Sequence, residues 1–462
     1  MFTSTKSHRI ATSRSHLASV ILFVVILVVT PNIAAQTKTV DSRLEQAAAL
    51  IRDSQLKEAE DQLTSILKTA PNEPRALNLL GAIRAQQGKF NEAEVFFSRA
   101  LRLDNQLVSA HMNLAHVSLL KGAPEKTIAE LKEVIRLEPH NAEATDKLAS
   151  LLLAQNHLDE CISFIEPMKD SASAALLVIL GDAYLKTHDA EKAEASYQLA
   201  FAKENDNADA LLGLAEVYQF RKDSQKAALY LARAKQSVAN SPATLYRFAL
   251  VAMRSGDDEE ANAALTQAVK LNPNEPSYFL ALGTTWLQKP DLFEAEKAFR
   301  RTLELQPDNS PAQLSLGYTL MMQKKYPEAR QWLEKSLEKN KDVPETFYYL
   351  GQIAQAQNEE QRAIEFFIKA IELAPTYSYA HAALGSSYLR LKNYPLAQHE
   401  LELSVKLNPD DGKAHYDLAV LFARIKNNER AQEEMQIVER LKTKSSAESK
   451  GPGSSRSPVP PE

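Results

Sequence analysis

One spacing constrains this chain more than any other feature: similar residues recur every 34 positions along most of its length. Gly351 has a counterpart at Gly385, and Pro375 has one at Pro409. Twelve repeats can be aligned in this register, and ten of the eleven steps between them are 34 residues. A repeat of this length is one supersecondary motif that buries its apolar face only by stacking on its neighbours. The repeats begin at Val40, Pro74, Val108, Ala142, Ala174, Ala208, Pro242, Pro276, Ser310, Pro344, Ser378 and Gly412.

The residue types inside each repeat predict two helices. Large residues at repeat positions 4, 7, 11 and 24 give each helix an apolar stripe. Position 8 is glycine or alanine in every repeat, and position 20 is alanine in all but two, where Thr127 and Cys161 stand. Small side chains at these positions predict a close approach of the two helices, and proline near position 32 ends the second helix. Each repeat is therefore expected to be a helical hairpin, and the fold class all-α.

These features resemble the tetratricopeptide repeat family: the period of 34, the leucine-glycine pair at positions 7 and 8, the alanines at 20 and 27 and the terminal proline. The resemblance implies a right-handed superhelical solenoid of about twelve helix-turn-helix units, which we expect over residues 36–441. Members of the family are typically non-enzymatic scaffolds that bind peptides or proteins in a concave groove. The fold itself does not specify the partner.

Two segments depart from the pattern. The repeat at residues 142–173 is two residues short and has Pro167 inside its second helix. Proline should shorten or kink that helix, and the irregularity either is tolerated or divides the solenoid into two sub-stacks. Residues 442–462 are rich in serine, proline and glycine, which predicts a disordered tail.

Residues 1–35 have the layout of an export signal. A basic, serine-rich start is followed by an apolar run of 13 residues, Leu17–Val29, and by Ala34 and Ala35. The run is shorter than the roughly 18 residues of a spanning helix. A cut after Ala35 places the large Ile33 three positions back, so an inner-membrane anchor at residues 17–35 stays an alternative. The sequence therefore predicts an exported protein of the bacterial periplasm or cell envelope.

Composition and motifs argue against several classes of function. The net charge is −5 and no basic stripe is visible, which argues against nucleic acid as the partner. The single cysteine, Cys161, makes neither a disulfide nor a thiolate zinc site by itself. His111, His381 and His415 all occupy position 4, where a packing role is expected. We therefore predict no catalytic residues, no metal and no cofactor.

By the same resemblance, positions 2, 5, 9, 12 and 13 of the first helices line the concave groove. In the middle and C-terminal repeats these positions carry large apolar and aromatic residues, which suit a protein interface. Ordinary packing is the alternative interpretation. The predicted groove residues are Phe220, Tyr246, Leu280, Leu314, Tyr318, Met321, Met322, Tyr348, Tyr379 and Tyr416.

The expected partner is a protein or peptide, and the apolar residues Leu280, Leu314 and Met321 favour it. Two groove devices of the family are missing, namely the lysine and asparagine clamp for carboxylates and the asparagine ladder at position 6, where only Asn113 stands. The alternative is a component of an envelope polysaccharide export machinery that binds glycan or its assembly proteins. Membrane contact is expected only through residues 1–35, if they are not cleaved.

Overall fold

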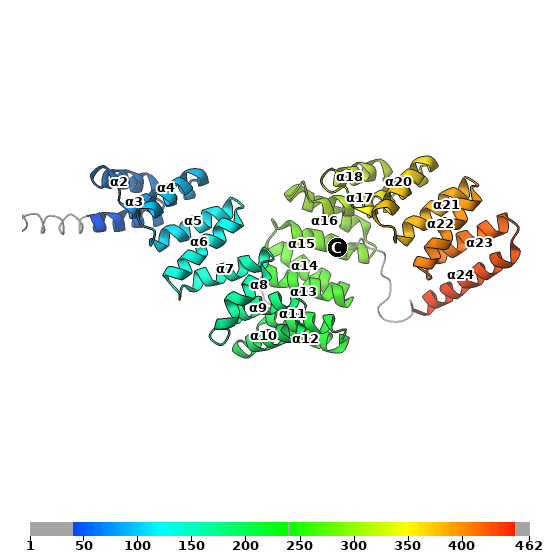
Figure 1. The fold of residues 1–462 in the computed structure, drawn as a ribbon, viewed down its shortest axis with the longest axis horizontal. Helices are drawn as coiled ribbons and strands as arrows, with labels where there is room; N and C mark the ends of the chain where they lie inside the picture. Colours follow the sequence, from blue (N-terminus) through cyan, green and yellow to red (C-terminus); the bar gives the residue numbers. More distant parts are fainter. Residues whose placement is uncertain (1–39, 239–240, 449–462) are drawn as a thin grey trace, which may run out of the picture. The chain divides into compact units, whose positions relative to one another are not determined.

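The structure is a computed structural model that describes residues 40–238 and 241–448. Every regular element in this part of the chain is a helix (Figure 1), which confirms the all-α prediction. The described chain forms two compact units, Met1–Ser196 and Tyr197–Glu462, with the boundary inside α10 (Ala190–Lys203). The predicted export signal at residues 1–35 lies outside the described residues.

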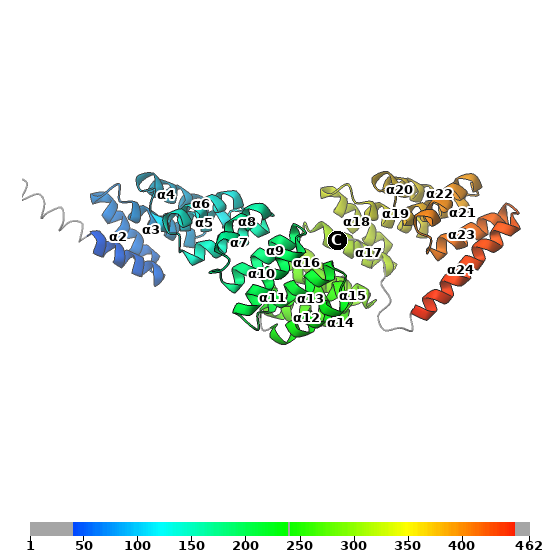
Figure 2. The same ribbon diagram turned by 60° about the horizontal axis from the view of Figure 1, so that its bottom comes forward.

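The first compact unit is a succession of antiparallel helical hairpins, which Figure 2 shows for α3 to α8. Residues 40–52 form its first helix. Short turns connect the helices, and each helix from α2 to α8 packs on the next one. The further helices are α2 (Leu56–Thr69), α3 (Pro74–Gln86), α4 (Phe90–Leu103), α5 (Val108–Leu120), α6 (Pro124–Leu137), α7 (Ala142–Ala154), α8 (Leu158–Ile165) and α9 (Ala174–Lys186).

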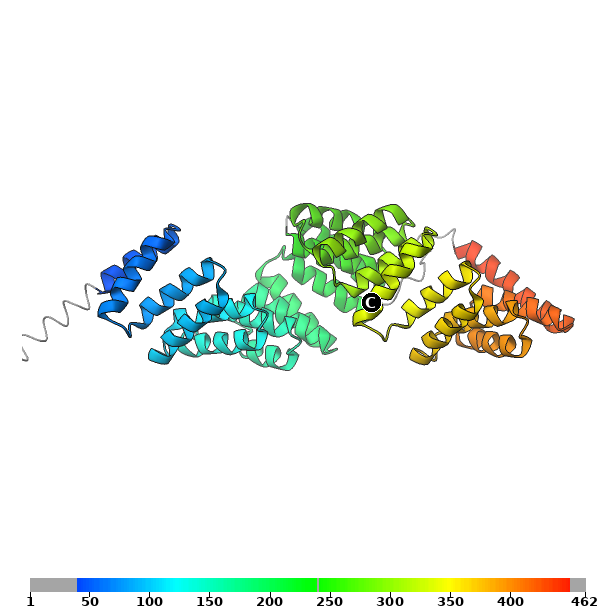
Figure 3. The same ribbon diagram turned by 90° about the horizontal axis from the view of Figure 1, so that it is seen from above.

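The second compact unit continues the same alternation, and Figure 3 shows it from another side. First helices have odd labels and second helices even ones. Its helices after α10 are α11 (Ala208–Phe220), α12 (Ser224–Ser237), α13 (Pro242–Ser255), α14 (Asp258–Leu271), α15 (Pro276–Gln288), α16 (Leu292–Leu305), α17 (Ser310–Met322), α18 (Tyr326–Lys339), α19 (Pro344–Ala356), α20 (Glu360–Leu373), α21 (Ser378–Arg390), α22 (Tyr394–Leu407), α23 (Gly412–Arg424) and α24 (Asn428–Glu448).

In three repeats glycine at position 8 makes room for a phenylalanine ring at position 24 of the same repeat. A β-carbon at Gly351 would lie 2.4 Å from Cε1 of Phe367, and one at Gly283 would lie 2.5 Å from Cε1 of Phe299. Such distances are far below van der Waals contact, so the glycine is a condition for burying the ring. Position 24 is buried throughout the array up to α22, also in the repeats that have alanine at position 8.

The turn inside each hairpin reverses the chain through a left-handed residue at position 15. The backbone φ there is positive in all twelve repeats, from 28° at Pro290 to 81° at Gly256. A residue in this conformation ends a helix and satisfies its last carbonyls. Only three of the twelve are glycine, and lysine holds the position four times.

The short repeat at 142–173 behaves as its proline predicts. Its second helix, α8, has 8 residues, whereas the second helices of the other repeats up to α22 have 14. Pro167 lies in the 3-10 turn Glu166–Met168 that follows α8. Because the boundary between the compact units is at Ser196, this repeat lies within the first compact unit.

The last helix is longer than the sequence suggested. α24 has 21 residues and ends at Glu448, so residues 442–448 are helical although we expected the tail to begin at 442. Residues 428–450 contain no proline or glycine, and the polar residues up to Glu448 permit the helix to continue. Residues 449–462 lie outside the described part.

Candidate partner-binding surface

A groove of about 320 Å³ lies across three consecutive first helices of the second compact unit. Tyr246 and Met253 line it from α13, Leu280 from α15 and Leu314 from α17. Tyr246, Leu280 and Leu314 all occupy position 5, so the period of 34 places them on equivalent helix faces. All three are half-buried. The groove is therefore an apolar strip that follows the repeat.

Three hydroxyl groups lie beside this strip, and each donates its proton to a hydrogen bond within the protein. Thr284 Oγ1 donates to Leu280 O at 3.1 Å, and Ser310 Oγ donates to Ser336 O at 3.2 Å. Ser277 Oγ donates to the Glu275 carboxylate at 2.7 Å. A hydroxyl that donates internally keeps acceptor lone pairs. The groove therefore offers apolar contact together with acceptors for N–H groups.

A tyrosine cluster lies on the next repeats, α17 to α21. The ring centroids of Tyr318 and Tyr349 are 4.9 Å apart, those of Tyr348 and Tyr377 5.3 Å, and those of Tyr377 and Tyr379 6.2 Å. The Tyr348 hydroxyl accepts a hydrogen bond from the Gln352 amide at 2.7 Å. Edge and tilted arrangements of this kind stabilise packed rings.

Burial keeps these tyrosines neutral. Desolvation raises the pKa of Tyr318 above its ordinary value and that of Tyr348 much further. Tyr349 and Tyr377 have raised pKa values for the same reason. These four residues present phenol hydroxyls, and not phenolates, at any physiological pH.

The predicted groove residues fall into three groups. Tyr246, Leu280 and Leu314 line the groove. Tyr318, Tyr348 and Tyr379 belong to the tyrosine cluster. Three further residues are exposed and line neither the groove nor the tyrosine cluster. One of them, Tyr416, lines a shallow pocket beside the end of α24. These three are Phe220, Met322 and Tyr416.

Met321 is a correction to the predicted surface. Its side chain is only 8% exposed and packs in the core with Leu316, Leu320 and Leu350. Position 12 faces the following repeat here, so this methionine contributes to the stack. Met322, the next residue, is 50% exposed.

A second hollow, which sequence reasoning missed, lies in the first compact unit. It has a volume of about 410 Å³ between α5, α6 and α7, and Met112, Leu119 and Leu131 give it an apolar lining. Ser150 and Ala154 on α7 also line the hollow, and their small side chains do not fill it. These two are small at positions 9 and 13, which was the available signal.

Three repeats share a buried histidine–glutamate pair that we did not predict. In each pair Nδ1 of the histidine lies 2.6 Å from Oε2 of a glutamate 19 residues later. Nε2 lies 3.0–3.2 Å from a backbone carbonyl at the end of the preceding repeat. The pair thus joins both helices of one repeat to its neighbour. The pairs are His111–Glu130, His381–Glu400 and His415–Glu434.

The signal for these pairs was present in the sequence. Position 4 is histidine in three repeats, and position 23 is glutamate in the same three and in no other. Gln313 donates to the equivalent carbonyl, Pro307 O, at 2.8 Å, but position 23 of its repeat is Trp332 and not glutamate. We expected these histidines to have a packing role. They are buried, but we did not predict their hydrogen bonds to glutamate and to the backbone carbonyl.

Three further features concern metal ligands, the single thiol and membrane-spanning helices. No group of three or more His, Cys, Asp or Glu there is arranged to hold a metal ion. Cys161 is fully buried, its thiol faces Ala149 O at 3.7 Å, and burial raises its pKa to about 11. Among the described helices none has the length and apolar character needed to cross a membrane.

Comparisons with known proteins agree with the repeat register. Models of the tetratricopeptide repeat match residues 44–107, 246–310, 382–444, 291–350 and 344–377, and a tetratricopeptide repeat-like domain model matches residues 105–224. No curated protein matches the sequence. Together the family matches cover most of the chain and coincide with the observed hairpins.

Two solved structures are similar at low identity. The APC/C hetero-tetramer Cut9–Hcn1 matches at 15% identity and a TM-score of 0.44, over 86% of this chain and 92% of that one. Yeast Tom70 matches at 16% identity and a TM-score of 0.40, over 89% of this chain and 97% of that one. On the repeat matches and the hairpins that they span, the chain belongs to the tetratricopeptide repeat family.

Proposed function

We propose that this protein is a non-enzymatic scaffold that binds a protein or peptide partner along the first helices of its second compact unit. The observation that carries the proposal is the groove lined by Tyr246, Leu280 and Leu314, with acceptor hydroxyls beside it. An extended peptide presents apolar side chains and backbone N–H groups together, which matches both features. The tyrosine cluster extends this surface over the following repeats.

Photo-crosslinking in cells tests the proposal. A photoreactive side chain replaces Leu280 in one variant and Leu314 in another, and captured species are identified by mass spectrometry. The same probe at Phe293, which is 71% exposed on α16 and outside the groove, is the matched control. We expect a discrete protein from both groove positions and not from Phe293.

Two results would contradict the proposal. One is capture of the same species from Phe293 as from the groove positions. The other is specific binding of a purified polysaccharide with no protein captured, which would move the function to the glycan alternative. In either case the groove would no longer be the protein-docking site.

We also propose that the protein is exported to the cell envelope. The support is the basic start and the apolar run Leu17–Val29, which lie outside the described residues. Fusion of residues 1–39 to a reporter that is active only outside the cytoplasm tests it. Activity that persists when four leucine or valine residues of the run become arginine would contradict it.

A further inference from the structure

The array ends in a helix pair whose stacking face is uncovered in the described chain. Position 24 is at most 6% exposed in each of the eleven repeats before the last, but Met435 at this position is 37% exposed. Position 20 is at most 3% exposed in the same eleven repeats, whereas Ala431 is half-buried. In ten of these eleven repeats the second helix packs against the first helix of the next repeat, which covers this face.

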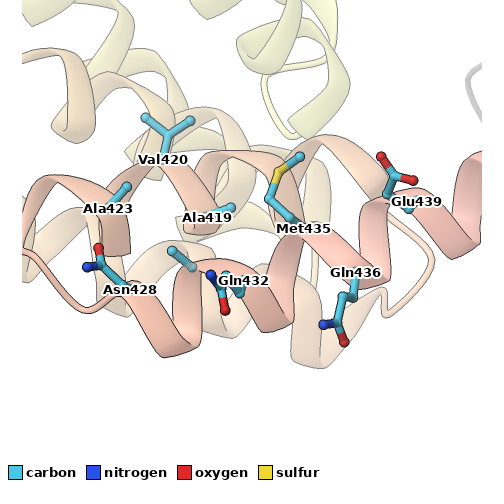
Figure 4. A pocket seen from close by; sticks show the side chains of 9 residues that line it. Ala419, Val420, Ala423, Asn428, Gln432, Met435, Gln436 and Glu439 are labelled. Atoms are coloured by element: carbon cyan, nitrogen blue, oxygen red, sulfur yellow. The ribbon is translucent and has the colours of Figure 1, made fainter.

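A groove of about 800 Å³ marks the uncovered face between α23 and α24. Figure 4 shows the side chains that line this groove, Ala419 and Ala423 from α23 and Gln432, Met435 and Gln436 from α24. The floor is apolar and made of small side chains, and the rim is polar. A small-residue floor between two helices has the shape that admits a third helix, as it does within the array.

The interior junctions define what fits such a face. Leu401, at position 24, packs in one core cluster with Leu418 and Leu421 of the covering helix α23. Leu333 packs in the same way with Leu350 and Ile353 of α19. These partners are positions 7 and 10 of the next repeat, and Phe97 repeats the relationship in the first compact unit with Leu114 and Val117.

The covering helix also carries a small residue four positions before the first of these. In α23 it is Ala414 and in α17 it is Ala312, both fully buried. The pattern is thus a small residue, then a leucine four positions later, then an aliphatic or short side chain three positions after that. Both spacings lie on one helix face.

Neither the tail nor the first helix of the array offers this pattern. Residues 449–462 contain four prolines and one aliphatic residue, Val459. The first helix, residues 40–52, has Ser42, Gln46 and Ala49 at positions 3, 7 and 10, and Gln46 is exposed. A polar residue at position 7 suits a helix at the start of a stack and does not match the face of α23 and α24.

We infer that the face of α23 and α24 around Met435 binds an amphipathic helix of another protein, which stacks there as the first helix of a thirteenth repeat would. The partner helix carries the small, leucine and aliphatic pattern of positions 3, 7 and 10. This site is separate from the groove on α13 to α17, so two partners can be held at once.

Fluorescence anisotropy with a defined probe tests the inference. The probe is a labelled peptide with the sequence of residues 412–424, the helix that covers the preceding repeat, crosslinked between positions 413 and 417 because isolated helices of this length are marginal. It is titrated with the full chain. We expect saturable binding, and none with a peptide in which the residues equivalent to Leu418 and Leu421 are aspartate.

Variants of the full chain locate the binding. Met435→Glu should weaken it by about tenfold or more, because a carboxylate would be buried in the contact. Ala423→Arg, at an exposed position, should block it by bulk. Met322→Glu places the same charge on another exposed methionine and should leave the affinity unchanged. Circular dichroism melting shows that each variant is folded.

Three outcomes would overturn the inference. The first is an absence of saturable binding. The second is an affinity of Met435→Glu and Ala423→Arg for the peptide that equals the affinity of the unchanged chain. The third is a self-association of the full chain that Met435→Glu abolishes. The last outcome would make a second copy of the chain the occupant of the face.

Discussion

Nδ1 of His381 lies 2.6 Å from Oε2 of Glu400, and Nε2 of the same ring lies 3.1 Å from Pro375 O. A carbonyl oxygen only accepts hydrogen bonds, so Nε2 must carry a proton. The remaining contact, between Nδ1 and the carboxylate, also needs a proton between its two atoms. The pair is satisfied only while it holds both protons.

Stability should therefore fall as pH rises. The hydrogen bond with Glu400 raises the pKa of His381 above its ordinary value of about 6.5. A raised folded-state pKa contributes stability that is complete below about pH 6.5 and is lost as pH rises through the higher folded value. We expect the melting temperature, measured by circular dichroism, to decrease as pH rises above about 6.5.

The array provides its own control for this effect. The repeat that begins at Pro344 has Phe347 and Phe366 at the same two positions. The double variant His381→Phe with Glu400→Phe should keep the fold and reduce the pH dependence of melting. An unchanged pH profile in the double variant would show that this pair is not its source.

Gly351→Ala should destabilise the protein by about 1–3 kcal/mol, because the added methyl group meets the buried ring of Phe367. Repeats with alanine at position 8 have leucine, isoleucine or methionine at position 24, so Phe367→Leu should recover part of the loss. Urea denaturation measures both. In Gly412→Ala the β-carbon meets nothing closer than 3.9 Å, so this control should be nearly neutral.

Lys392→Gly should stabilise the protein by roughly 0.5–1 kcal/mol, because its φ of 58° is strained for a side chain and free for glycine. Lys324→Gly, at a φ of 62°, should act in the same direction. Lys406→Gly, within α22, is the control and should destabilise. Thermal melting compares the three variants, and a loss of stability in Lys392→Gly would contradict the assignment of strain.

Cys161 should be inert in the folded protein. It is fully buried, and a pKa raised to about 11 leaves almost no thiolate at neutral pH. A thiol reagent should label it at a rate that follows global unfolding, and quickly in denaturant. Cys161→Ala should be nearly neutral because alanine fills this position in ten repeats. Rapid labelling of the native protein would show that α8 opens locally.

Tyr246→Ala or Leu314→Ala should weaken binding of the groove partner by about tenfold each, because both side chains line the groove. Phe293→Ala removes a large exposed ring from another surface and should not change the affinity. Isothermal titration with the partner captured by crosslinking measures these values.

The fold was predictable because its determinants are local and repeated. A glycine opposite a large ring, or a proline inside the second helix of the 142–173 repeat, has the same consequence wherever it stands, so the register alone located the helices. The end of α24 was missed because tail composition was judged as a whole, whereas the helix reaches Glu448 and glycine and proline begin only at Gly451 and Pro452.

The surface was harder to predict because exposure depends on the neighbouring repeat. Met321 and Met322 are adjacent and chemically identical, yet one is in the core and the other at the surface. The distinction depends on how α17 faces α19, which a position number does not specify. The His381–Glu400 pair needed two positions to be compared across repeats, which a search for single motifs does not do.

From α11 to α24 each helix of the second compact unit packs on the next one, so the faces that meet at one junction there resemble those at the following junctions. Duplication or deletion of one 34-residue segment would bring together two faces that already fit. The gene can therefore lengthen or shorten this protein by a whole hairpin in a single recombination event. A shift by any other number of residues would have to be absorbed within one repeat, as the 32-residue repeat does with the shortened helix α8.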